Sequence, residues 1–242
     1  MILYPAIDIR GGHAVRLVQG DYARETVFDA DPLDAAKRWV EQGAEWLHVV
    51  DLDGAREGRP VNLDAVERIA VQAGAPVQMG GGLRDAGSVA AALEAGVERV
   101  VIGTRAQSDP DFVGELVEAH GARAIVVALD AREGRIAVKG WTEPTTTPVD
   151  MLEIEVSTHG VRRYIFTPVE VDGTLAGPPL DQVRDLARSI EGELIYSGGI
   201  GTLDDLRALA HLDQPNLQGA IVGRALYEGH FTVGQARAAL TG

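Results

Sequence analysis

Two aspartates have the residue type and the spacing that proton-transfer chemistry requires. Asp8 and Asp130 each end a short apolar run, and the segments around them, Ile7–Gly12 and Leu129–Gly134, match at a shift of 122 residues. Two carboxylates on opposite sides of a substrate suit general acid–base catalysis, one ionised to take a proton and one protonated to give it. A single aspartate at the end of a strand more often forms a turn or a helix cap. The hypothesis of an acid–base pair therefore depends on the match between the two segments. The spacing does not indicate which aspartate is the base.

Glycines recur in two matched groups that could bind phosphate. The first group is Gly81, Gly82, Gly103 and Thr104, and the second is Gly198, Gly199, Gly223 and Arg224. Glycine lets backbone amides approach an anion closely, although it is also the default residue of tight turns. Because the two groups are matched, we predict two phosphate sites facing each other, and hence a long ligand with a phosphate at each end.

Five further side chains are candidates for contacts with the substrate: Arg16, His48, Trp141, Thr167 and Asp172. Taken singly, only Thr167 and Asp172 favour such a role. Arg16 could equally be a surface cation, His48 a hydrogen-bonded core histidine and Trp141 a lid packed on the fold. Asp172 could also be the first residue of an Asp-Gly turn.

Metal chemistry and nucleophilic catalysis find no support in the sequence. The six histidines lack the spacing of metal ligands, and the chain has no cysteine. We therefore predict no metal and no cofactor, and chemistry that depends on carboxylates alone.

Eight short apolar runs must position these residues, and they are typical of strands buried on both faces. The runs are Ile2–Ile9, Trp46–Leu52, Pro76–Met79, Val97–Ile102, Ala124–Leu129, Arg163–Phe166, Glu193–Tyr196 and Gly219–Val222. Between them lie segments with helical spacing, which open at Asp31, Asn62, Ser88, Asp109 and Thr202. The proline- and threonine-rich segment 144–148 is the most loop-like. Strict alternation of this kind predicts an α/β protein with a single (β/α)8 TIM barrel over residues 1–242, with the candidate site at the carboxyl ends of its strands.

An internal repeat divides this predicted barrel into two half-barrels of about residues 1–121 and 122–242. Besides the match around the two aspartates, the segment 50–54 matches 169–173, 80–83 matches 197–200 and 101–104 matches 221–224. All the shifts lie within a few residues of each other, which is unlikely for unrelated segments. The repeat places Asp8 and Asp130 on opposite sides of the barrel mouth.

Composition limits the partners. With 36 Asp and Glu against 22 Lys and Arg, the net charge of −14 argues against a nucleic-acid partner. A small anionic ligand is still possible, because a few backbone amides can reverse the potential locally. The beginning of the chain does not have the pattern of a signal peptide, and no apolar run is long enough to span a membrane. We expect a soluble, cytoplasmic monomer.

Several motifs together resemble one family along the whole chain. They are Pro5–Gly12, Val15–Gly20, Val49–Ala55, Gly80–Arg84, Gly140-Trp141, Asp172–Leu175 and Ala220–Tyr227. The chain resembles the histidine-biosynthesis isomerases that act on phosphoribosylformimino-aminoimidazole carboxamide ribotide. That resemblance implies a TIM barrel, an Amadori rearrangement of an aminoaldose to an aminoketose, and no cofactor.

The resemblance also implies residue roles. Asp8 would be the base at C2 of the sugar, and Asp130 the acid at the ring oxygen. Thr167, Asp172 and Trp141 would contact the substrate, Trp141 by covering it. Phosphate contacts would fall on both glycine groups.

Three alternatives accompany this interpretation. The next enzyme of the same pathway, a cyclase, usually has a cysteine in strand one and a catalytic lysine soon after, but this chain has no cysteine and no lysine before Lys37. A dual-substrate isomerase would also act on phosphoribosylanthranilate, and the C-terminal third is close to that branch. However, Lys139 and Gly80 replace the Arg and Ser typical there, and Lys cannot reproduce the planar fork of Arg. A non-catalytic bisphosphate-binding barrel is the third alternative, against which both aspartates argue.

Overall fold

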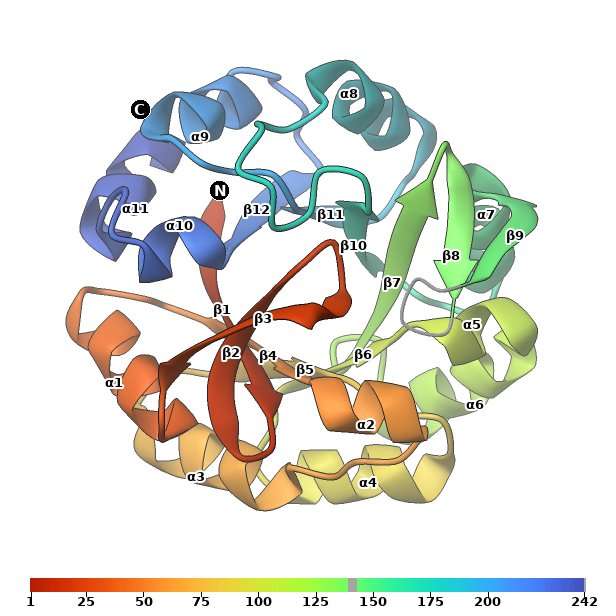
Figure 1. Ribbon diagram of the computed structural model, residues 1–242. Helices are drawn as coiled ribbons and strands as arrows, with labels where there is room; N and C mark the ends of the chain where they lie inside the picture. Colours follow the sequence, from red (N-terminus) through yellow and green to blue (C-terminus); the bar gives the residue numbers. More distant parts are fainter. Residues whose placement is uncertain (139–142, 242) are drawn as a thin grey trace.

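Eight parallel strands close into a barrel in the computed structural model, which describes residues 1–138 and 143–241. The strands are β1 (Ile2–Arg10), β4 (Leu47–Asp51), β5 (Val77–Gly80), β6 (Arg99–Ile102), β7 (Ile125–Arg132), β10 (Arg163–Pro168), β11 (Glu193–Ser197) and β12 (Leu217–Val222). Each pairs with the next, and β12 returns to pair with β1 (Figure 1). The predicted (β/α)8 TIM barrel is confirmed, with all eight apolar runs as its strands.

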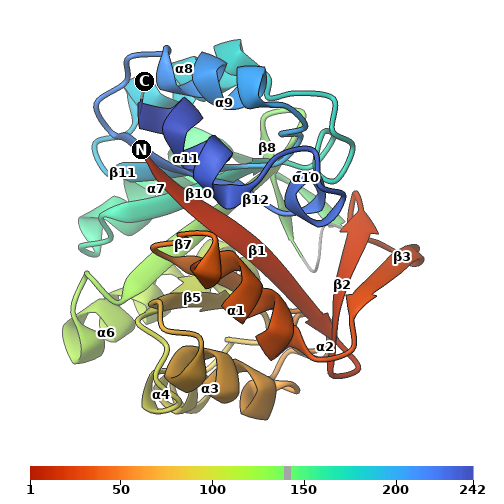
Figure 2. The ribbon, with the colours of Figure 1, turned by 90° about the vertical axis from the view of Figure 1, so that its left-hand side faces the viewer.

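Helices surround this barrel as an outer ring (Figures 1 and 2). They are α1 (Pro32–Glu41), α2 (Leu52–Glu57), α3 (Leu63–Gln72), α4 (Ala86–Glu94), α5 (Thr104–Ser108), α6 (Pro110–His120), α7 (Val149–Thr158), α8 (Leu180–Ser189), α9 (Leu203–Ala210), α10 (Arg224–Tyr227) and α11 (Val233–Thr241). In the part of the chain that the structure describes, none of them is long and apolar enough to cross a membrane.

Most of the predicted helix starts are confirmed. Asp31, Asp109 and Thr202 each cap a helix, accepting a hydrogen bond from a backbone N–H of the first turn. One predicted start is wrong, because Ser88 lies inside α4, which begins at Ala86 behind the cap Asp85. The start at Asn62 is confirmed, since α3 begins at the next residue, but the Asn62 side chain makes no cap bond. Its Oδ1 accepts from Gly12 N at 3.2 Å, and its Nδ2 donates to Asp51 and Asp53.

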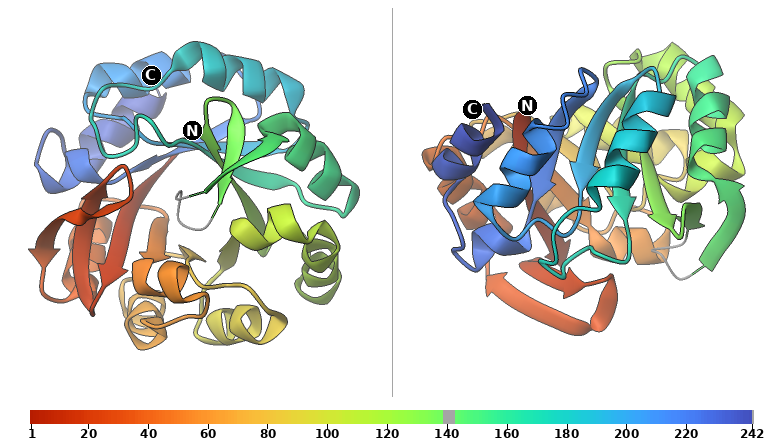
Figure 3. Two further views of the ribbon diagram at one scale, coloured as in Figure 1. Left: turned by 45° about the vertical axis from the view of Figure 1, so that its right-hand side comes forward. Right: turned by 90° about the horizontal axis from the view of Figure 1, so that it is seen from above.

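Two antiparallel hairpins rise from the carboxyl ends of β1 and β7, and the apolar pattern did not predict either of them. One is β2 (His13–Val18) with β3 (Asp21–Asp29), and the other is β8 (Arg135–Val138) with β9 (Glu143–Pro148). Figure 3 shows both at the same end of the barrel. The expectation of a loop over 144–148 is therefore wrong. This segment pairs with β8, and the Thr145 hydroxyl donates to the Ile136 carbonyl at 2.8 Å.

Alternation along the strands separates two apolar layers. Side chains that face outward pack under the helices, whereas a smaller cluster fills the barrel: Tyr4, Ala6, Val101, Val126, Ile165, Ile195 and Ile221. Because side chains alternate along a strand, the next inward position of β1 after Ala6 is Asp8, and that of β7 after Ala128 is Asp130. The side chains that face the barrel interior thus change from apolar to polar at the carboxyl ends of these strands.

Asp51 holds the carboxyl end of β4 in place. It is fully buried, and its carboxylate accepts hydrogen bonds from Gly54 N at 2.8 Å, Val61 N at 2.7 Å, and Asn62 N and Nδ2 at 2.9 and 2.7 Å. The end of β5 then crosses the Asp51 backbone so closely that a Cβ on Gly81, which has φ of +102°, would collide with the Asp51 carbonyl. Asp51 therefore shapes the β4 and β5 rim without facing the pocket.

Replacing Asp51 should destabilise the protein markedly. Asp51→Ala leaves several buried donors without an acceptor, and we expect the free energy of unfolding to fall by about 2–3 kcal/mol. Urea denaturation measures this, with Glu67→Ala at an exposed position of α3 as the control. A loss no larger than that of the control would show that this network contributes little.

Candidate active site

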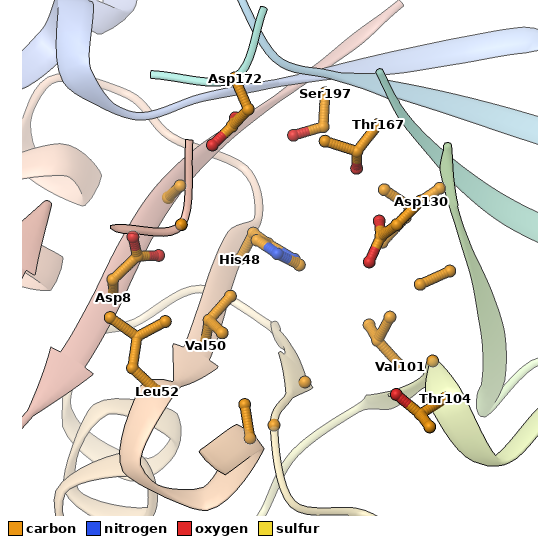
Figure 4. Close-up of a pocket in the computed structure, with 18 of the residues that line it drawn as sticks. Asp8, His48, Val50, Leu52, Val101, Thr104, Asp130, Thr167, Asp172 and Ser197 are labelled. Atoms are coloured by element: carbon orange, nitrogen blue, oxygen red, sulfur yellow. The ribbon is translucent and has the colours of Figure 1, made fainter. Parts of the chain in front are cut away.

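A pocket at the carboxyl end of the barrel is lined by side chains or backbone from all eight parallel strands. Figure 4 shows its centre, with Asp8 and Asp172 on one side, Asp130 and Thr167 on the other, and His48 between them. This is the end at which TIM barrels carry their active sites. The polar, inward-facing residues at the carboxyl ends of the strands therefore line one pocket.

The structure brings nearly all the sequence-predicted site residues together. The main pocket is lined by Asp8, Arg16, His48, Asp130, Thr167, Asp172, Gly81, Gly82, Gly103 and Thr104. A smaller adjoining pocket is lined by Gly198, Gly199, Gly223 and Arg224, and shares Arg16 and Asp172 with the first. Trp141 and Lys139 lie outside the described residues.

Arg16 is buried against Asp8 and is not a surface cation. It comes from β2 of the first hairpin, and its Nη1 lies 2.9 Å from Asp8 Oδ2, with both side chains less than 15% exposed. Burial raises the pKa of Asp8 to about 6, although the Arg16 charge lowers it and the Asp172 charge raises it further. Asp8 is therefore a carboxylate whose proton affinity lies close to neutral pH, as a general base requires.

Asp172 joins this charged group from the loop that follows β10. Burial also raises the pKa of Asp172, and Arg16 again opposes the shift. The loop is a turn, as the alternative interpretation expected, yet Asp172 lines both pockets. Its carbonyl accepts from Gln19 N at 3.1 Å, and a Cβ on Gly173 would lie 2.7 Å from the Leu17 carbonyl. The first hairpin thus lies directly against the β10–α8 loop and closes one side of the mouth.

His48 lies in the floor of the pocket as a neutral ring. Burial lowers the pKa of His48 to about 3, and the Arg16 charge lowers it further in the same direction. The Gln78 amide Nε2 lies 3.1 Å from His48 Nδ1. His48 is therefore both a hydrogen-bonded buried histidine, as one interpretation held, and a pocket residue.

Sequence reasoning missed Gln78 and Ser197. Gln78 is the single polar residue of an otherwise apolar strand run, which was a signal that could have been used. Ser197 ends β11, lines both pockets and takes the position that matches Gly80 in the repeat. Asp130 and Thr167 were both predicted, and they are direct partners in the register of β7 and β10.

The two glycine groups have closely similar backbone conformations. Gly81 and Gly198 have φ of +102° and +106°, and Gly82 and Gly199 have φ of +78° and +71°. Gly103 and Gly223 both precede a short helix, with φ of −101° and −113°. Arg224 is held by Glu228 at 2.6 Å and by the Gly173 carbonyl at 2.7 Å. A side chain on Gly223 would collide with the Arg16 guanidinium, so glycine there lets Arg16 reach this corner.

Comparisons with known proteins agree along the whole chain. A family model described as "Histidine biosynthesis protein" matches residues 2–232. Similar relatives are named as isomerases of an imidazole-4-carboxamide that carries two phosphoribosyl groups. One from Picosynechococcus sp. is 48% identical over 236 residues, covering 98% of this chain and 92% of the relative. One from Moorella thermoacetica is 47% identical, covering 98% of each chain, and one from Roseiflexus castenholzii is 50% identical, covering 99% of each.

The raised pKa of Asp8 predicts a pH-dependent effect on stability. The folded protein binds the Asp8 proton more tightly than the unfolded chain does, so this contribution is fully present below about pH 4 and is lost as the pH rises through about 6. Asp8→Asn imitates the protonated form. Its stability relative to the unchanged protein should therefore rise by about 2–3 kcal/mol between pH 4 and pH 8.

Urea denaturation at both pH values measures this difference, with exposed Asp64→Asn as the control. An Asp8→Asn difference that does not change with pH would contradict the burial argument.

The glycine corners predict two anion sites. Crystals soaked in sulfate or phosphate should show one anion near Gly82 and Thr104 and another near Gly199 and Arg224, because the two backbones are so similar. A single anion, or anions elsewhere on the rim, would remove the argument for a ligand with two phosphates.

Proposed function

This chain belongs to the histidine biosynthesis protein family, and from that premise we propose that it is an aldose–ketose isomerase. Its substrate is an imidazole-4-carboxamide ribonucleotide that carries a second phosphoribosyl group, and the reaction is the Amadori rearrangement of that group. The observation that carries the proposal is the placement of Asp8 and Asp130 on opposite sides of one pocket, with a glycine corner toward either end. This arrangement matches a substrate that has a phosphate at each end and reacts in the middle.

The rearrangement needs two proton transfers. Asp130 gives a proton to the ring oxygen, the C1–O bond breaks, and the lone pair of the amino nitrogen forms a C1=N bond. Asp8 then takes the proton from C2, the electrons of that C–H bond form a C1=C2 bond, and the electrons of the C1=N bond return to nitrogen, which gives an enolamine. Its tautomerisation gives the ketone at C2. Protein carboxylates can serve both steps when their surroundings hold them in different protonation states.

The surroundings of Asp8 favour its role as the base. With its pKa near 6, Asp8 is mostly ionised at neutral pH while remaining more basic than an exposed aspartate. Arg16 keeps the carboxylate charged and holds it in one position at 2.9 Å. Thr167 and Asp172 would bind the sugar, and Gly81, Gly82, Gly103, Thr104, Gly198, Gly199, Gly223 and Arg224 the phosphates.

The other assignments extend this proposal. Relatives are named for the imidazole carboxamide reaction alone, which gives no support to a second activity on phosphoribosylanthranilate. The protein would act in the cytoplasm as a monomer, without a cofactor, on a small-molecule bisphosphate. Both halves of the barrel, about 1–121 and 122–242, would belong to one domain, since the pocket takes residues from each.

Exchange of either aspartate for asparagine tests the proposal. Asp8→Asn and Asp130→Asn keep the shape of the side chain but cannot transfer a proton, so each should lower kcat by about 10²–10⁴. KM should change little, because the phosphates are bound elsewhere. Asp8→Asn should be the more severe, since ring opening has some uncatalysed rate and C–H abstraction has very little.

Steady-state kinetics with the aminoaldose measures both variants, with substrate binding checked separately. Asp64→Asn, at an exposed position of α3 that does not line either pocket, is the matched control. If either pocket variant keeps more than about a tenth of kcat, a rate too high for loss of a proton-transfer group, its role is wrong. If the unchanged protein does not turn over the aminoaldose, the proposed function is wrong.

A further inference from the structure

A glutamine lies inside the barrel, directly beneath the candidate active site. Gln78 is fully buried in β5, where Val77 and Met79 face outward and Gln78 faces inward. Gln78 does not line the pocket, and the inward residues around it are apolar apart from its register partners, His48 in β4 and Arg99 in β6. A buried primary amide is unfavourable unless its polar atoms are paired, so an apolar side chain would be the ordinary occupant of such a position.

The contact that Gln78 makes is with His48. The two residues are direct partners in the register of β4 and β5, and Gln78 Nε2 lies 3.1 Å from His48 Nδ1. The Gln78 side chain makes no other hydrogen bond in the described part of the chain, where its Oε1 is buried without a partner. Pairing of its own polar atoms therefore does not explain why a glutamine occupies this position. The contact with His48 is the remaining explanation.

This contact determines which nitrogen of His48 carries the proton. An amide nitrogen can only donate, so Nδ1 must accept, and the proton of a neutral imidazole then resides on Nε2. The ring is neutral because burial and the Arg16 charge both lower the pKa of His48. Figure 4 shows the ring directed into the pocket, between Asp8 on one side and Asp130 on the other.

We propose that Gln78 is a positioning residue that fixes His48 as the Nε2–H tautomer, so that the ring donates a hydrogen bond to the oxygen on C2 of the reacting sugar. This rests on the proposed isomerase function. The C2 oxygen becomes a carbonyl during the reaction, and a fixed donor stabilises the charge that develops on it. A neutral imidazole suits this task because it donates without supplying a mobile proton that Asp8 would compete for.

A tautomer measurement tests the proposal without any substrate. In protein labelled with 15N-histidine, the His48 resonances, assigned by their absence in His48→Asn, should show a protonated Nε2 and a bare Nδ1. Gln78→Met has a similar volume and no donor, so the form of His48 with the proton on Nδ1 should become populated. A protonated Nδ1 in the unchanged protein, or an unchanged tautomer in Gln78→Met, would overturn the proposal.

Kinetics then tests whether the tautomer matters. Gln78→Met removes the donor and should lower kcat by about 10-fold or more, the size of effect typical when the partner that orients a functional histidine is removed, with KM nearly unchanged. Ile195→Val is the matched control, because Ile195 is buried in the same barrel interior but does not line the pocket. An unchanged kcat in Gln78→Met, or an equal loss in Ile195→Val, would overturn the positioning role.

The two measurements separate the inference from the function on which it rests. If the unchanged protein has no isomerase activity, the proposed function fails, whereas the tautomer of His48 is still decided by the spectra. If Gln78→Met does not fold, as judged by circular dichroism, Gln78→Leu, which also lacks a donor, supplies both the spectroscopic and the kinetic readout. A changed tautomer with full kcat would then overturn the catalytic part of the proposal.

Discussion

Closure of the parallel barrel is the constraint on which the rest of the structure depends. Once β12 pairs with β1, every second side chain of each strand must face the axis, where no water can satisfy a polar group deep inside. The interior is accordingly apolar up to Ala6 and Ala128, and polar side chains lie mainly toward its two ends, with Arg99 against Tyr4 and Trp46 at the amino end and the pocket residues at the carboxyl end. Asp8, Asp130 and Thr167 lie together because they are the first inward positions beyond that apolar layer. The same rule makes Gln78 an exception, since it is polar below the rim, and an exception in a barrel interior calls for a specific partner.

The charged residues of the pocket are buried, although burial is unfavourable for charged groups. Asp8, Asp172 and Arg16 form a buried group in which one guanidinium serves two carboxylates, and the pKa of each carboxyl is raised despite it. Asp172 therefore raises the proton affinity of Asp8 while Arg16 limits the rise. A site built for stability would pair each charge separately, whereas this one leaves Asp8 close to the pH at which it would have to exchange protons.

Sequence reasoning identified most of the fold and most of the residues of the pocket for one physical reason. Strands buried on both faces leave continuous apolar runs, and the residue that ends each run lies at the rim, so Asp8, Asp130 and Thr167 could be placed from their neighbours alone. The first hairpin was not predicted because β3 is largely exposed, and an exposed strand has no apolar pattern in its sequence. The burial of Arg16 could not be predicted for a different reason, because it depends on how β2 folds back onto β1. The Asn62 side chain makes no cap bond because its Oδ1 accepts from a long-range partner, Gly12 N, while its Nδ2 donates to Asp51.

The repeat pairs the two aspartates but does not by itself assign their roles. The first hairpin brings the Arg16 guanidinium to 2.9 Å from the Asp8 carboxylate. A cation stabilises the ionised form of a neighbouring carboxyl. The glycine corners remain alike because both would bind the same kind of group. The spacing of the aspartates could not distinguish these roles, but the residue eight positions further along the chain supports Asp8 as the base.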